Sequence, residues 1–126
     1  MTPFATSRSA RPALARAARR LARDGFIVTD DTSDTLSDMY RRMSRWPNSA
    51  RAFSHADGTP LHEGDRLIQG DLAGVLTAIA EQGPRGFYEG PVADKLAKAI
   101  QDAGGIMTTD DLKSYQPVLR TPVRGT

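Results

Sequence analysis

Apolar residues recur at helical spacing in four stretches of the chain. The pattern predicts helices over residues 12–24, 34–43, 71–82 and 91–103. The stripes expected to face inward comprise Leu14, Ala17, Ala18 and Leu21 in the first helix; Leu36, Met39, Tyr40 and Met43 in the second; Leu72, Val75, Leu76, Ile79 and Ala80 in the third; and Val92, Leu96, Ala99 and Ile100 in the fourth. The sequence therefore predicts a mainly α fold.

Residues that favour helix ends flank these stretches. Pro12 suits a first helical turn, and Gly25 follows the first helix where a capping glycine is expected. The segment Thr29–Ser33 can accept hydrogen bonds from the free amides of the second helix. Thr108–Asp111 is expected to cap a further short helix that ends near Tyr115.

The remaining segments lack helical periodicity. Residues 1–11 are expected to be irregular, which divides the chain into that segment and a helical segment over residues 12–126. Phe26–Val28 can pack back on the first helix or enter a short extended segment. Residues 46–65 contain repeated turn signals, and Trp46-Pro47 is expected to end the second helix. The tail from Val118 to Thr126 favours the start of an edge strand.

The composition limits how large a core the chain can form. It has 126 residues, of which 39% are hydrophobic and 6% aromatic, so one small domain with a thin core is expected. There are no cysteines, which excludes disulfides, thiolate metal sites and a cysteine nucleophile. The spacing of the two histidines, His55 and His62, matches no zinc motif, so both are expected at the surface.

Basic residues are concentrated at the start of the chain. The first 24 residues hold six arginines, at positions 8, 11, 16, 19, 20 and 23, and one acid, Asp24. No series of aromatic residues accompanies them, which argues against nucleic-acid binding. No apolar run has the length of a membrane span, and no secretory signal is evident, so the sequence leaves the location open.

Several local patterns could carry chemistry but have simpler structural explanations. Thr108-Thr109-Asp110 has no adjacent base to activate a hydroxyl, and it reads as a helix cap. Gly104-Gly105 could line an anion site, but such a pair is typical of a helix end. Ser114 and Tyr115 have no evident triad partners.

The acidic residues Asp30, Asp31, Asp34 and Asp38 could attract a cation. They lack the loop glycine and terminal glutamate of a calcium loop, so solvated cap residues are expected. The residues alone therefore assign no catalytic, cofactor-binding or metal-binding position.

Three strings resemble the large subunit of γ-glutamyltransferases, also called γ-glutamyltranspeptidases or glutathione hydrolases. They are LARDGFIV (residues 21–28), GDRLIQGDLAGVLTAIAEQGPRGFYEGPVADKLAKAI (64–100) and DAGGIMTTDDLKSYQPVLRTPVRGT (102–126). They include the Gly-Asp-x-Leu-x-Gln turn, the Phe-Tyr-x-Gly connection, the Gly-Gly pair and the Thr-x-x-Asp-Leu-x-x-Tyr cap. The chain is thus identified as an internal segment of such a subunit.

The resemblance implies an N-terminal-nucleophile hydrolase with an αββα core, to which this segment contributes helices and is incomplete as a fold. Members of the family cut themselves into two subunits, and the new N-terminal threonine of the small subunit attacks the γ-glutamyl amide. That threonine, the oxyanion loop and the carboxylate-binding arginine have no counterpart here. The chain alone is therefore expected to be inactive, with no catalytic residue and no cofactor.

The implied partners are the remainder of the large subunit and the small subunit. The alternative is a non-catalytic helical protein-interaction module, or a remnant, derived from the family. The γ-glutamyl donor and acceptor, the choice between the γ-glutamyltransferase and cephalosporin acylase branches, and the oligomeric state stay open. An isolated segment of this kind is expected to be marginally stable or to self-associate, with a poorly ordered tail.

Overall fold

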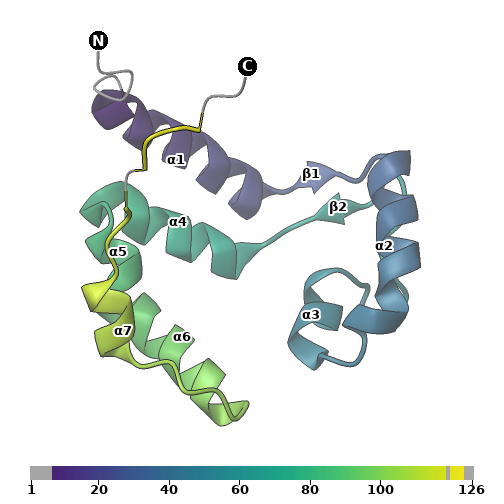
Figure 1. Cartoon of the computed structure of the whole chain (residues 1–126). Coiled ribbons are helices and arrows are strands. Elements are labelled where there is room, and N and C mark those ends of the chain that lie inside the picture. Colours follow the sequence, from purple (N-terminus) through teal and green to yellow (C-terminus); the bar gives the residue numbers. More distant parts are fainter. Residues whose placement is uncertain (1–6, 119, 124–126) are drawn as a thin grey trace.

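The computed structural model describes residues 7–118 and 120–123 (Figure 1). The helices and strands in chain order are α1 (Ser7–Asp24), β1 (Phe26–Ile27), α2 (Asp30–Met43), α3 (Pro47–Ala52), β2 (Arg66–Leu67), α4 (Gly70–Gln82), α5 (Arg85–Tyr88), α6 (Pro91–Asp102) and α7 (Thr109–Ser114). The chain is mainly helical, and each of the four predicted helices is present.

The elements form two lobes joined by a short ribbon (Figure 1). Helix α1 packs on α4, α4 packs on α5, and α5 contacts both α6 and α7. We call these five helices the body. Helices α2 and α3 contact each other, and together with the loop that leads to β2 they form the knob, residues 28–65. The antiparallel strands β1 and β2 make up the ribbon between body and knob.

The ribbon is fixed to the end of α1. Its register pairs Phe26 with Leu67 and Ile27 with Arg66. The Arg66 guanidinium donates to the carbonyl of Asp24 at 3.2 Å, where the last carbonyls of a helix lack helical partners. Beyond β2, the Gln69 amide donates to the Ala22 carbonyl at 2.8 Å. These contacts place the start of α4 beside the end of α1.

The knob has a small core of large apolar side chains. Val28 is fully buried and packs with Leu36, Leu61 and Leu67, and Met43 and Phe53 surround them. The chain enters and leaves the knob beside this core. There the Val28 amide donates to the Asp65 carbonyl at 2.8 Å, and the Gly64 amide donates to the Val28 carbonyl at 3.0 Å.

The body is packed mainly through small residues. Its buried apolar residues are Ala22, Ala73, Ala93, Ala97 and Leu112. Larger side chains of the same helices stay exposed: Leu14 at 69%, Leu21 at 53% and Leu72 at 43%. Alanines therefore make up most of the fully buried apolar residues of the body, while Leu14, Leu21 and Leu72 remain on its surface.

The predicted inward stripe of the first helix is consequently wrong. Leu14, Ala17, Ala18 and Leu21 are all exposed, whereas Ala22 is buried. In α6 the predicted stripe is mostly turned inward, since Val92, Leu96 and Ile100 are half-buried; Ala99 is exposed, and Ala93 and Ala97 are the buried residues. Apolar spacing shows which face of a helix is apolar but not which element packs against it. A neighbouring face with small alanine side chains lets two helices approach more closely, so that face can be the buried one.

Two predicted helix starts also change. Helix α1 begins at Ser7, so residues 7–11 are helical instead of irregular, and Pro12 lies in the second turn; residues 1–6 lie outside the described residues. Helix α2 starts at Asp30, directly after the cap Thr29, whose side chain accepts from the Thr32 amide. Both changes lengthen helices whose Ala-, Arg- or Asp-rich starts suit helical turns.

Two further expectations fail. Residues 47–52 form helix α3 in the region predicted as turns, because Pro47 occupies the first helical position instead of only ending α2. The expected strand in the tail is not formed by residues 118 and 120–123, and the rest of that segment lies outside the described residues. The ribbon, which holds the two strands of the described chain, does not pair with it.

We expect the contact between α4 and α5 to tolerate no added methyl group. A Cβ at Gly86 would overlap the backbone carbonyl of Ala78, whereas a Cβ at Gly74, on the exposed side of α4, would meet nothing within 4 Å. Gly86→Ala should lower the free energy of unfolding by about 1–3 kcal/mol through overpacking. Gly74→Ala should raise it by about 0.5–1 kcal/mol through helix propensity.

Urea unfolding followed by circular dichroism measures both variants. Equal effects of the two substitutions would show that α5 is not seated on α4.

Candidate functional site

Thr108, the first threonine of the pair before α7, caps that helix, as predicted. Thr108 Oγ1 accepts a hydrogen bond from the Asp111 amide at 3.2 Å. The Asp111 carboxylate accepts from the Thr108 hydroxyl at 2.7 Å and from its amide at 2.8 Å. These bonds, the one from the hydroxyl first, hold the pKa of the Asp111 carboxyl below its ordinary value. The Thr108 hydroxyl thus stabilises the start of a helix.

The glycine pair ends α6. Gly104 has a φ of +85°, and the Gly105 amide donates to the Ile100 carbonyl at 2.8 Å. A Cβ at position 105 would overlap the side chain of Ile100. The pair therefore closes a packed helix end, which confirms the predicted terminator.

The residues that follow pack on the body as well. Ser114 Oγ donates to the Asp111 carbonyl at 3.3 Å, and the Tyr115 ring stacks on Tyr88 with centroids 5.5 Å apart. Phe87 meets Tyr88 edge to face at 5.1 Å. The Phe-Tyr pair of the α4–α6 connection thus anchors that connection against the end of α7.

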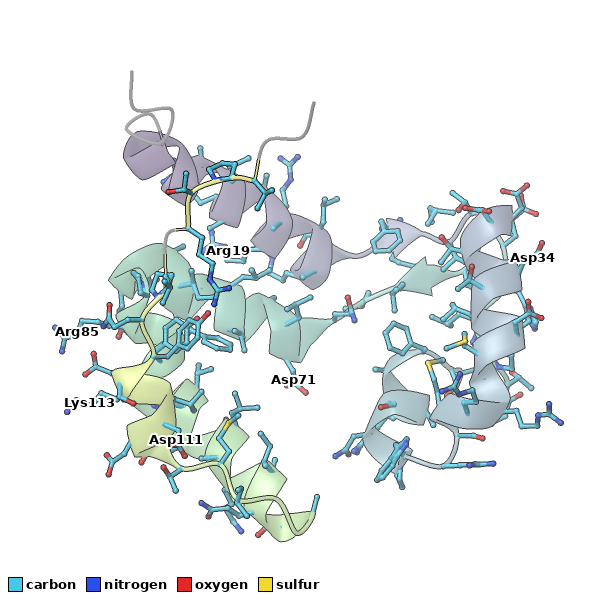
Figure 2. The ribbon with its side chains drawn as sticks, in the orientation of Figure 1. Arg19, Asp34, Asp71, Arg85, Asp111 and Lys113 are labelled. Atoms are coloured by element: carbon cyan, nitrogen blue, oxygen red, sulfur yellow. The ribbon has the colours of Figure 1, made fainter. Side chains whose placement is uncertain are left out.

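The four aspartates of α2 are exposed and do not converge. Asp30 and Asp31 lie in the first turn, where acidic side chains suit the helix dipole. Figure 2 shows Asp34 on the outer side of the helix, pointing away from the ribbon. Within residues 7–118 and 120–123, no three metal-ligating side chains come together. Asp30 and Asp31 thus lie at the helix start as predicted, whereas Asp34 and Asp38 lie farther along α2 and are not cap residues.

The two histidines do not lie in equivalent surroundings. Both are exposed, but His55 Nε2 lies 2.9 Å from Asp65 Oδ2, and the His62 amide donates to that oxygen at 2.7 Å. The hydrogen bond from the His62 amide and, to a smaller degree, the interaction with His55 hold the pKa of the Asp65 carboxyl below its ordinary value of 3.8. Asp65 therefore ties two turns of the knob together beside the Val28 core.

Sequence reasoning identified Asp65 only as part of a turn motif. The residue types alone could not show that it binds a histidine ten positions earlier. The available signal was that two polar residues able to bind each other, His55 and Asp65, lie on either side of the apolar residue Leu61 in the sequence.

An open cleft of about 600 Å³ separates α3 from the start of α4. Its lining residues are Asn48, Arg51, Ala52, Ile68, Gln69, Gly70, Asp71 and Leu72. Asp71 lies in the first turn of α4, as expected, and Figure 2 shows its carboxylate pointing outward. Among these lining residues there is no serine, threonine or histidine, so the cleft pairs no hydroxyl nucleophile with a base.

Comparison with known proteins gives these features a context. The family model described as gamma-glutamyltranspeptidase matches residues 11–126. The chain belongs to the γ-glutamyltranspeptidase family. It is 42% identical over 106 residues to the glutathione hydrolase proenzyme of Escherichia coli, a match that covers 84% of this chain and 18% of that protein. It is 38% identical over 105 residues to the acylase ACY 1 proenzyme of a Pseudomonas strain, covering 83% and 19%.

Solved structures of a γ-glutamyltranspeptidase and of another transpeptidase share the arrangement of helices. The Helicobacter pylori enzyme superposes with a TM-score of 0.80 at 33% identity, over 83% of this chain and 30% of that chain. The Bacillus anthracis transpeptidase CapD superposes with a TM-score of 0.77 at 32% identity, over 91% and 38%. The predicted resemblance and the predicted fold class, a helical segment of an N-terminal-nucleophile hydrolase, are both confirmed.

The chain spans about a fifth of the length of these curated relatives, with 18% coverage in the E. coli case. In the described part of the chain, no helix combines the length and apolar character needed to cross a membrane.

The two threonines of α7 provide a matched test of the cap. Thr108→Ala should lower the free energy of unfolding by about 1 kcal/mol, because it removes the side chain that holds the Asp111 amide. Thr109→Ala should have a much smaller effect, since Thr109 is the first helical residue and lies outside the capping box. Denaturant titration of both variants provides the measurement, and a larger loss at Thr109 would contradict the cap.

Acid should loosen the knob through Asp65. Because folding lowers the pKa of this carboxyl, its stabilising contribution is complete above its ordinary pKa of 3.8 and is lost as the pH falls through the lowered pKa. The free energy of unfolding of Asp65→Asn should therefore vary less than that of the wild type below about pH 4.

At neutral pH the same variant should speed hydrogen exchange at the Val28 and Gly64 amides. Asp34→Asn removes an equal charge from the outer side of α2 and serves as the control. Identical acid profiles for wild type and Asp65→Asn would contradict this role of Asp65.

Proposed function

We propose that this chain is a structural segment of a γ-glutamyltranspeptidase large subunit and contributes no catalytic group. The rest of the large subunit and a small subunit carrying an N-terminal threonine would complete the enzyme. The completed enzyme would cleave or transfer the γ-glutamyl group of glutathione and related amides, the reaction that the family resemblance implies.

One observation carries this proposal: helix α1 packs on α4 and buries Ala22, yet it leaves Leu14 and Leu21 exposed. Leu14 and Leu21 lie seven residues apart and so on the same side of the helix. Burying a leucine typically stabilises a fold by about 1.5–3 kcal/mol. A helix that leaves two of them in water is well suited to pack against another part of a larger protein.

The residues that follow α6 also leave large apolar side chains exposed. Ile106 is 93% exposed, and Tyr115, Val118 and Val123 are also exposed. Together with α1, these residues give the body apolar surface on separate elements. This distribution is typical of a segment that other parts of a fold surround.

The hydroxyl groups of Thr108 and Ser114, which were candidates for chemistry, make hydrogen bonds that support a structural role. Thr108 is engaged in the capping box, and Ser114 donates to a backbone carbonyl of the same helix. A threonine nucleophile of this enzyme class uses its own α-amino group as the base, which an internal threonine does not possess.

The isolated chain should show no turnover of a γ-glutamyl anilide, because the proposal places the nucleophile and the oxyanion donors in other segments. Residues 11–126 grafted in place of the matching segment of the E. coli glutathione hydrolase proenzyme should instead support self-cleavage into two subunits and restore turnover. Gel analysis and the anilide assay give the two readouts.

The control graft carries Leu14→Ser and Leu21→Ser and should lose self-cleavage, because polar groups would then lie in the expected interface. A second graft with Arg16→Ser and Arg20→Ser changes the same helix and should retain it. Turnover by the highly purified isolated chain, or an inactive wild-type graft that is correctly folded, would contradict the proposal.

A further inference from the structure

A basic surface with one exposed tryptophan lies at the end of the knob, and the family assignment does not account for it. Residues 39–56 contain four arginines, Arg41, Arg42, Arg45 and Arg51, and no aspartate or glutamate. Trp46, the single tryptophan of the chain, lies among them and is 66% exposed. We call these five residues the basic tip.

The arginines of the basic tip are available to a partner. All four are exposed, and none forms an ion pair with another residue in the described part of the chain. By contrast, Arg23 pairs with Asp24, and Arg85 pairs with Glu89. The tip therefore carries four positive charges without an ion-pair partner in the described part of the chain, and Asp38 and Asp57 flank it in the sequence.

Helix α2 places the two acidic residues of its first turn away from this charge, and Asp38 lies one turn before Arg41 and Arg42. Asp30 and Asp31 lie in its first turn, and Arg41 and Arg42 lie in its last. Eleven residues of helix correspond to a rise of about 16 Å, about twice the Debye length in physiological salt. An anionic surface that approached the α3 end of α2 would meet the arginines while the aspartates of the first turn stayed screened.

Figure 1 shows that this end is accessible from outside. Helices α2 and α3 lie across the ribbon from the body, and the α2–α3 connection forms the lower corner of the knob. Figure 2 shows Asp34 near the opposite, upper end of α2. The basic tip is thus a projecting corner, a shape that suits contact with a flat surface.

We propose that the basic tip binds the surface of an anionic phospholipid membrane. Guanidinium groups pair with phosphate in bidentate geometry, and tryptophan favours the boundary between lipid headgroups and acyl chains. Met39, which is 41% exposed one turn before the arginines, adds apolar surface. A phospholipid surface offers phosphate groups and an apolar boundary together. The arginines of the tip can bind the phosphates, and Trp46 can lie at the boundary.

A single-stranded nucleic acid fits the tip less well. Such ligands are bound by several aromatic side chains on which successive bases stack, and Trp46 is the only aromatic residue of the tip. The proposal is independent of the role of the chain in catalysis, because the tip residues belong to the knob; of these, Arg51 also lines the cleft beside α4.

Trp46 allows binding to be measured directly on the full chain, since all tryptophan fluorescence comes from the tip. Vesicles of phosphatidylcholine mixed with phosphatidylglycerol should shift its emission to the blue and co-sediment with the chain. Vesicles of phosphatidylcholine alone should do neither, and added salt should weaken binding.

The variant Arg41→Gln/Arg42→Gln/Arg45→Gln should lose about a hundredfold in affinity, from about fivefold for each arginine near an anionic surface. The matched control Arg16→Gln/Arg20→Gln/Arg23→Gln removes the same charge from α1 and should bind within a few-fold of the wild type. Replacing the three tip arginines with lysine keeps the charge and should retain most of the affinity. Circular dichroism verifies that each variant is folded.

Equal loss of binding in the two glutamine variants would overturn the proposal, because it would show attraction to net charge without a defined surface. Equal binding to neutral and anionic vesicles would overturn it as well. So would an emission shift with inorganic phosphate or duplex DNA at concentrations where the vesicles produce none.

Discussion

One close approach, of Gly86 in α5 to the Ala78 carbonyl in α4, leaves no room for a side chain at position 86 and fixes how these two helices of the body meet. The α-carbon of Gly86 lies so close to the backbone of Ala78 that even a methyl group would overlap it. Helix α5 in turn contacts α6 and α7, so the position of both depends on this one approach. Ala22 and Ala73 are the buried residues of α1 and α4, which continue the same close packing on the other side of α4.

Packing through small residues determines what the surface looks like. Alanine faces bring helices together but remove little apolar area from water, so they stabilise less than leucine contacts do. The leucines of α1 are left outside, whereas Val28, Leu36 and Leu61 of the knob form a buried core with Leu67 of the ribbon. The two lobes therefore differ in kind: the knob has its own core, and the body has faces suited to further partners. Membership in the γ-glutamyltranspeptidase family, in which the chain spans about a fifth of a whole relative, is consistent with that difference.

Local sequence signals predicted the helices and their ends well. Thr29 and Thr108 cap the helices they were expected to cap, and Gly25 ends α1 with a positive φ. The inward face of α1 could not be predicted in this way, because an apolar stripe shows only that a face is apolar and not whether its partner lies in the same chain. Pro47 was ambiguous for a related reason, since proline both stops one helix and suits the first turn of the next.

Contacts between distant residues were also beyond the sequence pattern. The ribbon pairs residues about forty positions apart, and the bond between His55 and Asp65 forms only when two turns of the knob meet. The central claim is that the leucine face of α1 is completed by the rest of a large subunit, and hydrogen exchange tests it most directly. Measured on the isolated chain and on the same residues grafted into the E. coli relative, protection of α1 amides should rise on assembly, while protection around Val28 in the knob should stay the same. Full protection of α1 in the isolated, monomeric chain would contradict the claim.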